Sequence, residues 1–212
     1  MKIHTFTFNP FYENTYVIAN NDGECIIIDP GCYEIEEKDI LEKFISDNNY
    51  TVKRLINTHC HIDHVLGNSF VKNKYKVILE GHKDDQETLK AVEAYAPSYG
   101  FSNYESTEMD SFLSEHDEIS LGDITFKILF VPGHAPGHIA LYNEKEKVLI
   151  GGDVLFNGSI GRTDLPGGDF DTLANSIKSK FYTLPDDVIV YSGHGDSTTI
   201  GKEKVSNPFV KA

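Results

Sequence analysis

The segment at positions 58–64 constrains this 212-residue chain more than any other, because it reads Thr-His-Cys-His-Ile-Asp-His. It gathers three imidazoles and one carboxylate directly after the apolar run Leu55-Ile56. The ligating groups should therefore follow the carboxyl end of a strand, where loops on a rigid scaffold commonly carry function. Histidine and aspartate clustered in this way predict a metal site.

Three further segments have the same form, in which an apolar run is followed by one or two small residues and then by histidine or aspartate. The apolar runs occupy residues 128–131, 148–150 and 188–191. They lead to His134, Asp153 and His194. Glycine before each of these residues lets the backbone turn sharply. We expect all four strand ends to converge at one edge of a sheet.

The predicted metal ligands are His59, His61, Asp63, His64, His134, Asp153 and His194. One zinc ion takes about four ligands, of which a catalytic site draws about three from the protein. Seven ligands therefore suit two ions, with Asp153 as a bridge between a three-histidine site and a site formed by Asp63, His64 and His194. Paired metals about 3.5–4 Å apart are a common hydrolytic arrangement. The predicted cofactor is two divalent ions, zinc first, with iron or manganese as alternatives.

Other residues near these ligands receive different interpretations. Three histidines lack the strand-end context and are expected to be ordinary residues: His4, His82 and His116. His138 is expected to support the site. Cys60 is expected to be non-ligating, because successive side chains of an extended segment point to opposite faces. Asp29 is either a turn residue or an acceptor that orients a ligand imidazole, and the sequence leaves both open.

The composition limits the partners and the setting. The chain has 19 Lys and Arg against 33 Asp and Glu, a net charge of −14, which disfavours a nucleic-acid surface or an anionic membrane. A hydrophobic content of 40% fits one folded domain over residues 1–212. Three cysteines, no signal-like N-terminus and no apolar run of about 18 residues predict a cytoplasmic location. The oligomeric state stays open.

Hydrophobic periodicity predicts more strands than helices, with helices in both halves. Expected strands are residues 3–8, 15–19, 25–29, 52–56, 77–79, 119–121, 125–131, 139–142, 148–150 and 188–191. Expected helices are residues 35–48, 64–73, 83–94, 171–181 and 200–205. The acidic stretch 98–118 is expected to be a loop over the body. Two central sheets covered by helices on the outside would satisfy this pattern.

The histidine-rich segment, its three strand-end partners and Asp29-Pro30-Gly31 resemble the metallo-β-lactamase superfamily. The resemblance covers almost the whole chain. It implies an α/β fold of the αββα sandwich type, in which two β-sheets lie face to face with helices on the outer faces. It also implies that the metals lie at one edge of the sandwich.

Within the superfamily, the chain looks most like glyoxalase II and its shorter relatives. This rests on PGHAPGH at 132–138, GDVLF at 152–156 continuing to GSIGRTD at 158–164, and GHGD at 193–196. The resemblance implies a dinuclear thioester hydrolase, in which a metal-bridging hydroxide attacks S-D-lactoylglutathione or a related small acyl-thiol. It implies that Arg162 binds an anionic part of the substrate. We further predict that Asp63 is catalytic and orients the hydroxide.

Two departures from glyoxalase II concern recognition of the thiol. The chain stops at Ala212, so we expect a short form without the helical domain that adds contacts to glutathione. Gly195-Asp196 stand where Glu-Tyr is usual. The alternative is a mononuclear iron enzyme like the persulfide dioxygenases, although that branch tends to carry Cys in place of His138, or another superfamily hydrolase. A closed structural site is disfavoured, because such sites usually use thiolates.

Overall fold

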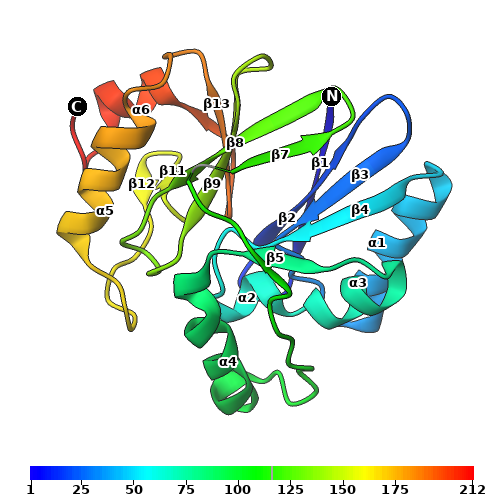
Figure 1. Cartoon of the computed structure of the whole chain (residues 1–212). Helices are drawn as coiled ribbons and strands as arrows, with labels where there is room; N and C mark the ends of the chain where they lie inside the picture. Colours follow the sequence, from blue (N-terminus) through cyan, green and yellow to red (C-terminus); the bar gives the residue numbers. More distant parts are fainter. Residues whose placement is uncertain (116) are drawn as a thin grey trace.

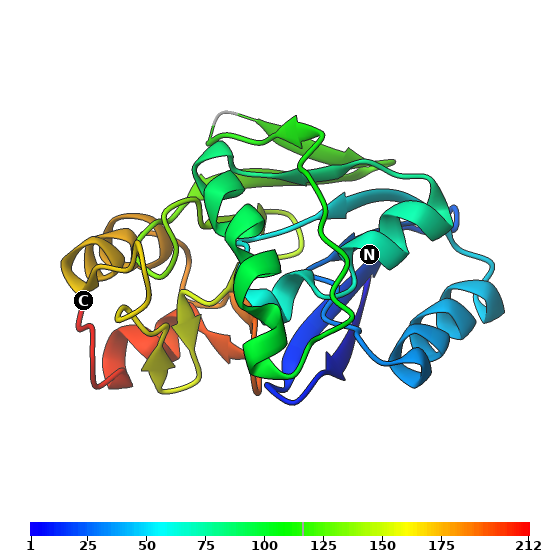
Figure 2. The same ribbon diagram turned by 90° about the horizontal axis from the view of Figure 1, so that it is seen from below.

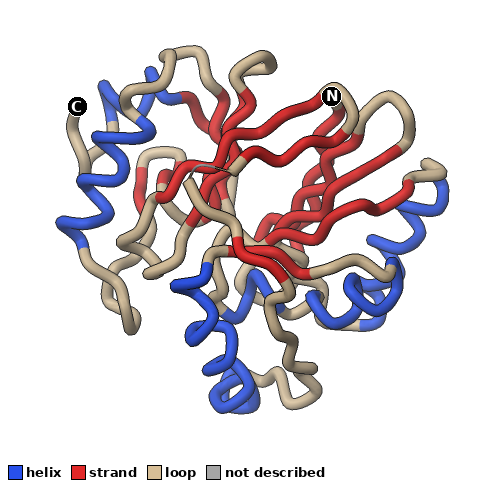
Figure 3. The backbone as a smooth tube through the Cα atoms, in the orientation of Figure 1, coloured by secondary structure: helices blue, strands red, loops and turns tan. Residues whose placement is uncertain are grey.

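The fold is an αββα sandwich, as the sequence predicted. The computed structural model describes residues 1–115 and 117–212, so the expectation for His116 lies outside the described residues. Two six-stranded sheets pack face to face in the middle of the molecule, and helices lie on the outside of both (Figures 1 and 3). No helix in the described ranges is long and apolar enough to cross a membrane.

The first sheet is built from the N-terminal half in the order β1-β2-β3-β4-β5-β6. Its strands are β1 (Lys2–Phe8), β2 (Glu13–Ala19), β3 (Glu24–Ile28), β4 (Thr51–Ile56), β5 (Leu79–Gly81) and β6 (Ser111–Phe112). The first three pair antiparallel and the later pairs are parallel. The helices of this half are α1 (Ile35–Asp47), α2 (Ile62–Val65), α3 (Asn68–Tyr75), η1 (Lys83–Asp85), α4 (Gln86–Tyr95) and η2 (Ala96–Tyr99).

The second sheet has the order β14-β13-β10-β9-β8-β7. Its strands are β7 (Glu118–Leu121), β8 (Ile124–Phe130), β9 (Ile139–Asn143), β10 (Val148–Gly152), β13 (Ile189–Ser192) and β14 (Thr198–Thr199). A small hairpin, β11 (Leu155–Phe156) and β12 (Ser159–Ile160), projects after β10, and α5 (Phe170–Ser176), the π-helix η3 (Ile177–Phe181) and α6 (Ile200–Ser206) complete this half. Because β10 and β13 are parallel and β9 is antiparallel to both of its neighbours, β8, β10 and β13 end at the same edge.

The core lies between the two sheets and continues under the helices. On β2, Tyr16 and Ile18 face the second sheet, where they share one buried cluster with Phe126 and Leu141. The alternate residue Val17 belongs to the cluster under the outer helices. Both faces of the central strands are therefore buried, which explains why their sequences are apolar without alternation.

Three expected elements differ from the structure. The expected helix 64–73 is broken into α2 and α3 at Gly67, whose N–H donates to the Pro30 carbonyl at 2.7 Å. A Cβ at Gly67 would lie 2.6 Å from Cys32 Sγ, so packing against a distant loop overrides the local helical spacing. The expected helix 171–181 widens into a π-helix after Ser176. The stretch expected to be a loop contributes β6, which extends the first sheet.

Candidate metal centre

The predicted ligands lie together where the edges of the two sheets meet, not at the edge of one sheet. The first sheet supplies four of them, through the loop after β4 and the short helix α2: His59, His61, Asp63 and His64. The second sheet supplies the other three, just after β8, β10 and β13: His134, Asp153 and His194. The site therefore depends on the packing of both sheets.

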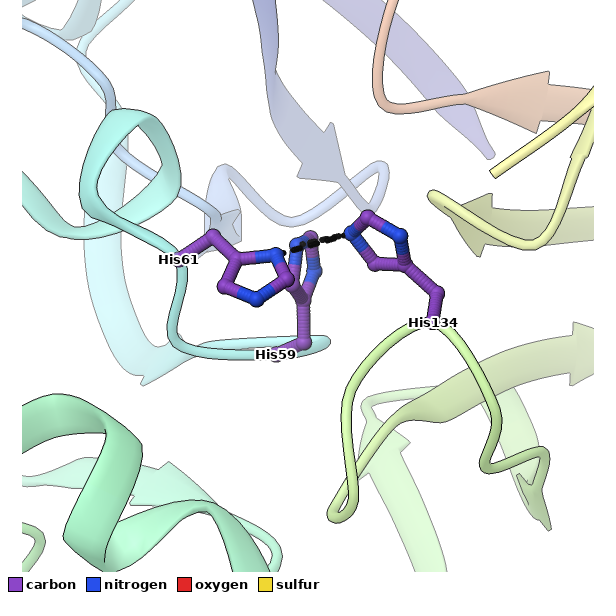
Figure 4. A group of neighbouring side chains, drawn as sticks. All are labelled: His59, His61 and His134. Atoms are coloured by element: carbon purple, nitrogen blue, oxygen red, sulfur yellow. Dashed lines mark hydrogen bonds between the residues drawn. The ribbon is translucent and has the colours of Figure 1, made fainter. Parts of the chain in front are cut away.

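Three ring nitrogens form the first group (Figure 4). His134 Nε2 lies 2.8 Å from His61 Nδ1 and 3.2 Å from His59 Nε2. Burial, with help from neighbouring imidazoles, holds the pKa of His59 well below its usual range and lowers that of His61 to about 3. Both rings are therefore neutral near pH 7 and present lone pairs, which is the form of histidine that ligates metals.

The second group consists of Asp63, His64 and His194, whose potential ligand atoms lie within 4.8 Å of one another. Asp63 Oδ2 is 3.1 Å from His194 Nε2 and 3.7 Å from His64 Nε2. Burial would lower the pKa of His64, but the charges of Asp63 and Asp153 raise it well above its ordinary value. The carboxylates thus attract positive charge to this position.

Asp153 lies between the two groups. Its Oδ2 is 3.5 Å from His134 Nε2 in the first group and 3.4 Å from His194 Nε2 in the second. Its Oδ1 is 3.5 Å from His64 Nε2. Although burial opposes ionisation, these imidazoles hold the pKa of Asp153 well below its usual range. One ionised carboxylate can therefore contact ions in both groups.

Hydrogen bonds on the outer side fix three of the rings. His134 Nδ1 pairs with the carbonyl of Arg162 at 2.8 Å, and His194 Nδ1 with the carbonyl of Phe11 at 3.0 Å. His64 Nδ1 lies 3.2 Å from Asp29 Oδ2. Each Nδ1–H donates to an oxygen, so Nε2 is the ring nitrogen left facing the cluster, where it can ligate a metal. Of the two roles left open for Asp29, its contacts match the acceptor that orients a ligand imidazole.

The residues fit a pair of divalent cations. In the described part of the chain, His64 Nε2 and Asp153 Oδ1 are buried without a hydrogen-bond partner. Buried polar atoms are almost always paired, so these two mark a place for a ligand that the protein alone does not supply. Five imidazoles and two carboxylates are donors that zinc, iron and manganese accept.

His138 and Cys60 flank the ligands without facing the cluster. The His138 ring stacks on His59 with centroids 4.7 Å apart, and its Nε2 accepts the Asp153 N–H at 3.0 Å. It therefore holds two predicted ligands in place. Cys60 is buried in the outer core, and none of the potential metal-ligand groups found in residues 1–115 and 117–212 includes it.

Arg162 lies at the rim of the site. Its guanidinium is paired with Asp164, through Nε–Oδ1 and Nη2–Oδ2 distances of 2.7 and 2.8 Å, and 61% of its side chain is exposed. Its contact with the metal cluster is the backbone carbonyl that orients His134. The predicted role in binding an anion therefore requires a substrate that extends outward from the cluster.

Sequence reasoning missed three buried carboxyl groups around the site. Glu13 Oε1 is 3.9 Å from His64 Nδ1, and burial raises the pKa of Glu13 well above its usual range. Glu203 on α6 accepts the N–H of Gly158, which anchors the hairpin that connects Asp153 to Arg162. Asp85 is the third. No local pattern marks these residues, since the contacts that tie them to the site are with residues distant in the sequence.

Asp85 joins the two loops that carry the first group. This buried carboxylate accepts the N–H of Cys60 at 2.6 Å and the N–H of Gly137 at 3.0 Å. Cys60 lies between two predicted ligands on the first sheet, and Gly137 follows His134 on the second. Asp85 therefore fixes the spacing of the two loops without touching the metal cluster.

Replacing Asp85 with alanine should destabilise the protein and lower its metal content. Two buried N–H groups would lose their acceptor, at a cost of about 1–3 kcal/mol each. The stability and metal content of Asp85→Asn should lie between those of the wild-type protein and Asp85→Ala, because an amide offers one acceptor oxygen. Urea unfolding and elemental analysis measure both effects. Asp84→Ala is the matched control, since the Asp84 side chain is 48% exposed. Equal stability of the two alanine variants would contradict this role.

Comparison with known proteins agrees with this geometry. A sequence model described as the Metallo-beta-lactamase superfamily matches residues 8–194. The chain belongs to this superfamily. Hydroxyacylglutathione hydrolase GloC of Haemophilus influenzae is 37% identical over 214 residues, which cover 100% of this chain and 99% of that protein.

Two solved structures resemble this superfamily member over its length. One is titled BLEG-1 B3 metallo-beta-lactamase, with a TM-score of 0.90 and 34% identity, and the match covers 100% of both chains. The other is titled TTHA1623 in a di-iron-bound form, with a TM-score of 0.86 and 30% identity, covering 98% of this chain and 100% of that one. Together with the sequence relative, the superfamily match identifies the chain as a metal-dependent hydrolase.

Proposed function

We propose that this enzyme hydrolyses thioesters of small acyl-thiols, with S-D-lactoylglutathione as the first substrate to test. The observation that carries the proposal is the placement of Asp153 between two groups of ligand atoms, which provides for two ions at one reaction centre. The full-length similarity to a relative named hydroxyacylglutathione hydrolase supports the substrate class.

The two groups define which residues would hold each ion. The first ion would be held by His59, His61 and His134, the second by Asp63, His64 and His194, and Asp153 would contact both. When bound, such ions polarise an acyl carbonyl and lower the pKa of water to about 7. We propose zinc, because nitrogen and oxygen donors in this number are typical of it. Iron is the alternative, since the relative TTHA1623 holds two irons.

Asp63 is the proposed catalytic residue of this chain. Burial opposes its ionisation, but His64 and His194 lower the pKa of Asp63, so the carboxylate is charged near pH 7. Its Oδ2 faces the cluster and can accept a hydrogen bond from the attacking water, which orients the water toward the carbonyl. A thiolate leaves readily, so the site needs no neutral acid beside the leaving group.

The proposal also includes the cellular compartment in which the enzyme acts. All three cysteines lie in the described residues, and none forms a disulfide. Unpaired buried thiols support a reducing compartment, and we propose that the enzyme acts in the cytoplasm.

Purified zinc-loaded protein should hydrolyse S-D-lactoylglutathione, measured as the loss of thioester absorbance. Asp63→Asn should lower kcat by at least about 100-fold, the usual contribution of a positioned acid or base. Near-full activity of Asp63→Asn would contradict the role of Asp63. No turnover by the metal-loaded wild-type protein would overturn the substrate. Oxygen uptake with glutathione persulfide and hydrolysis of a β-lactam then distinguish the remaining superfamily activities.

A further inference from the structure

An exposed aromatic surface lies beside the metal centre and takes no part in the core between the sheets. Its exposed rings are those of Phe11, from the β1–β2 turn, and Tyr99, from η2. The half-buried Tyr95 at the end of α4 and the buried Phe101 lie against them, and we call these four residues the aromatic rim. The Phe11 ring centroid is 6.2 Å from that of Tyr99 and 6.0 Å from that of Phe101, and those of Tyr95 and Tyr99 are 5.7 Å apart. Tyr99 is 56% exposed and Phe11 is 40% exposed.

The β1–β2 turn is fixed directly on the second ligand group. His194 Nδ1 contacts the Phe11 carbonyl at 3.0 Å. Asn9 Nδ2 donates to the Asp63 carbonyl at 3.0 Å, and Asn9 Oδ1 accepts the N–H of Phe11 at 3.0 Å. The backbone of Phe11 is therefore held by contacts with two predicted ligands, the His194 side chain and the Asp63 carbonyl, the latter through Asn9.

The two tyrosines connect the metal centre with Arg162. Burial raises the pKa of Tyr95 to about 12, and the nearby charge of Asp63 contributes to the rise. Hydrogen bonds to Asp164 raise the pKa of Arg162, and the nearby Tyr99 hydroxyl adds to it. The geometry of the aromatic rim is set by Phe11, whose turn contacts His194 and Asp63, and by Tyr99, whose ring lies against that of Phe11. Seen from below, α4 crosses the middle of the molecule, and the segment after it continues from its end (Figure 2).

The chemistry of the aromatic rim suits a peptide-like group that carries a carboxylate. Aromatic faces pack against amide planes, and a phenol hydroxyl donates a hydrogen bond. A guanidinium has five N–H donors, and the pair with Asp164 uses those on Nε and Nη2. In a glutathione thioester the peptide lies in the thiol half, which would extend outward from the metal centre when the lactoyl carbonyl is held there.

We propose that Phe11 and Tyr99 form the subsite for the thiol half of the substrate, with the Tyr99 hydroxyl and the Arg162 guanidinium holding its carboxylate. This inference rests on the proposed thioesterase function. It assigns recognition of the thiol to the β1–β2 turn and the segment after α4. It also explains why two large aromatic side chains remain exposed next to a metal centre.

The test compares two thioesters of the same acyl group. S-D-lactoylglutathione carries the peptide, and S-D-lactoyl-N-acetylcysteamine is short and uncharged. Tyr99→Ala should raise KM for the glutathione thioester about tenfold, equivalent to about 1.4 kcal/mol, with kcat within about twofold. KM for the short thioester should not change. Tyr99→Phe should raise KM for the glutathione thioester less than Tyr99→Ala does. The difference separates the contribution of the hydroxyl from that of the ring. Phe209→Ala is the matched control, because Phe209 is 55% exposed and lies near the C-terminus.

A binding measurement separates this inference from the proposed function. S-methylglutathione should bind the metal-free wild-type protein in calorimetry, and Tyr99→Ala and Phe11→Ala should weaken that binding about tenfold. An equal rise in KM for both thioesters, or unchanged binding in both variants, would overturn the subsite. Failure of the wild-type enzyme to hydrolyse either thioester, with S-methylglutathione still bound at the aromatic rim, would overturn the reaction while supporting the subsite.

Discussion

Asp153→Ala should abolish hydrolysis and release metal from both positions. The carboxylate of Asp153 lies between the two ligand groups, with Oδ2 near both His134 and His194. Its removal would take a negative charge and a ligand atom from each of the two proposed ions. Loss of a single donor that stabilises charge at a reaction centre lowers the rate by about 10²–10³-fold. The loss of both metal ions should therefore lower the rate by more than about 10³-fold.

Elemental analysis should show two ions per chain in the wild-type protein and fewer than one in Asp153→Ala. The backbone N–H of Asp153, which donates to His138, is unchanged by the substitution, so the fold should remain and circular dichroism can verify it. Asp39→Ala is the matched control, because Asp39 is exposed on α1. A variant that retains both ions and full turnover would exclude Asp153 as the bridge.

Removal of the metals should lower the unfolding temperature by at least roughly 10 °C, the effect expected for a single ion. An ion that binds only the native state at about 1,000 times its Kd contributes about 4 kcal/mol of stability. For a chain of this length, each kcal/mol shifts Tm by about 2–4 °C. The ions bind only the native state here, because the first sheet supplies His59 and Asp63 while the second supplies His134 and His194.

Differential scanning calorimetry with and without a chelator measures this effect. Zinc added back after chelation should restore the original Tm, which excludes irreversible damage. Asp153→Ala should unfold at the same temperature with and without chelator. An unchanged Tm of the wild-type protein, at a metal content confirmed to be zero, would show that the ions do not couple the two sheets.

The ligand positions follow a pattern that can be found in the sequence. Each ligand-bearing loop follows an apolar strand, and its glycines tolerate close packing: a Cβ at Gly193 would lie 2.1 Å from Asp153 Oδ1. The predicted sandwich and its superfamily are confirmed. The roles of the individual ligands, of Asp63 and of Arg162 stay predictions, although the structure brings the ligands together and places Arg162 at the rim.

The features that the sequence did not predict depend on contacts between distant residues. Gly67 interrupts the expected helix because Pro30 and Cys32 lie against it. Asp85 resembles any aspartate at the start of a helix, a position where the residue is common for capping. Only the folded chain shows that its carboxylate accepts N–H groups from Cys60 and Gly137.

The division of the ligands between two sheets also orders their appearance during synthesis. A growing chain contains the whole first group once His134 has been added, whereas the second group lacks His194 for another 60 residues (194 − 134). β13, which leads to His194, pairs with β10 on the side of the second sheet that only β14 extends further. The ribosome therefore delivers the ligands of the two groups in a fixed order: the three histidines of the first group first, then Asp153, and His194 of the second group last.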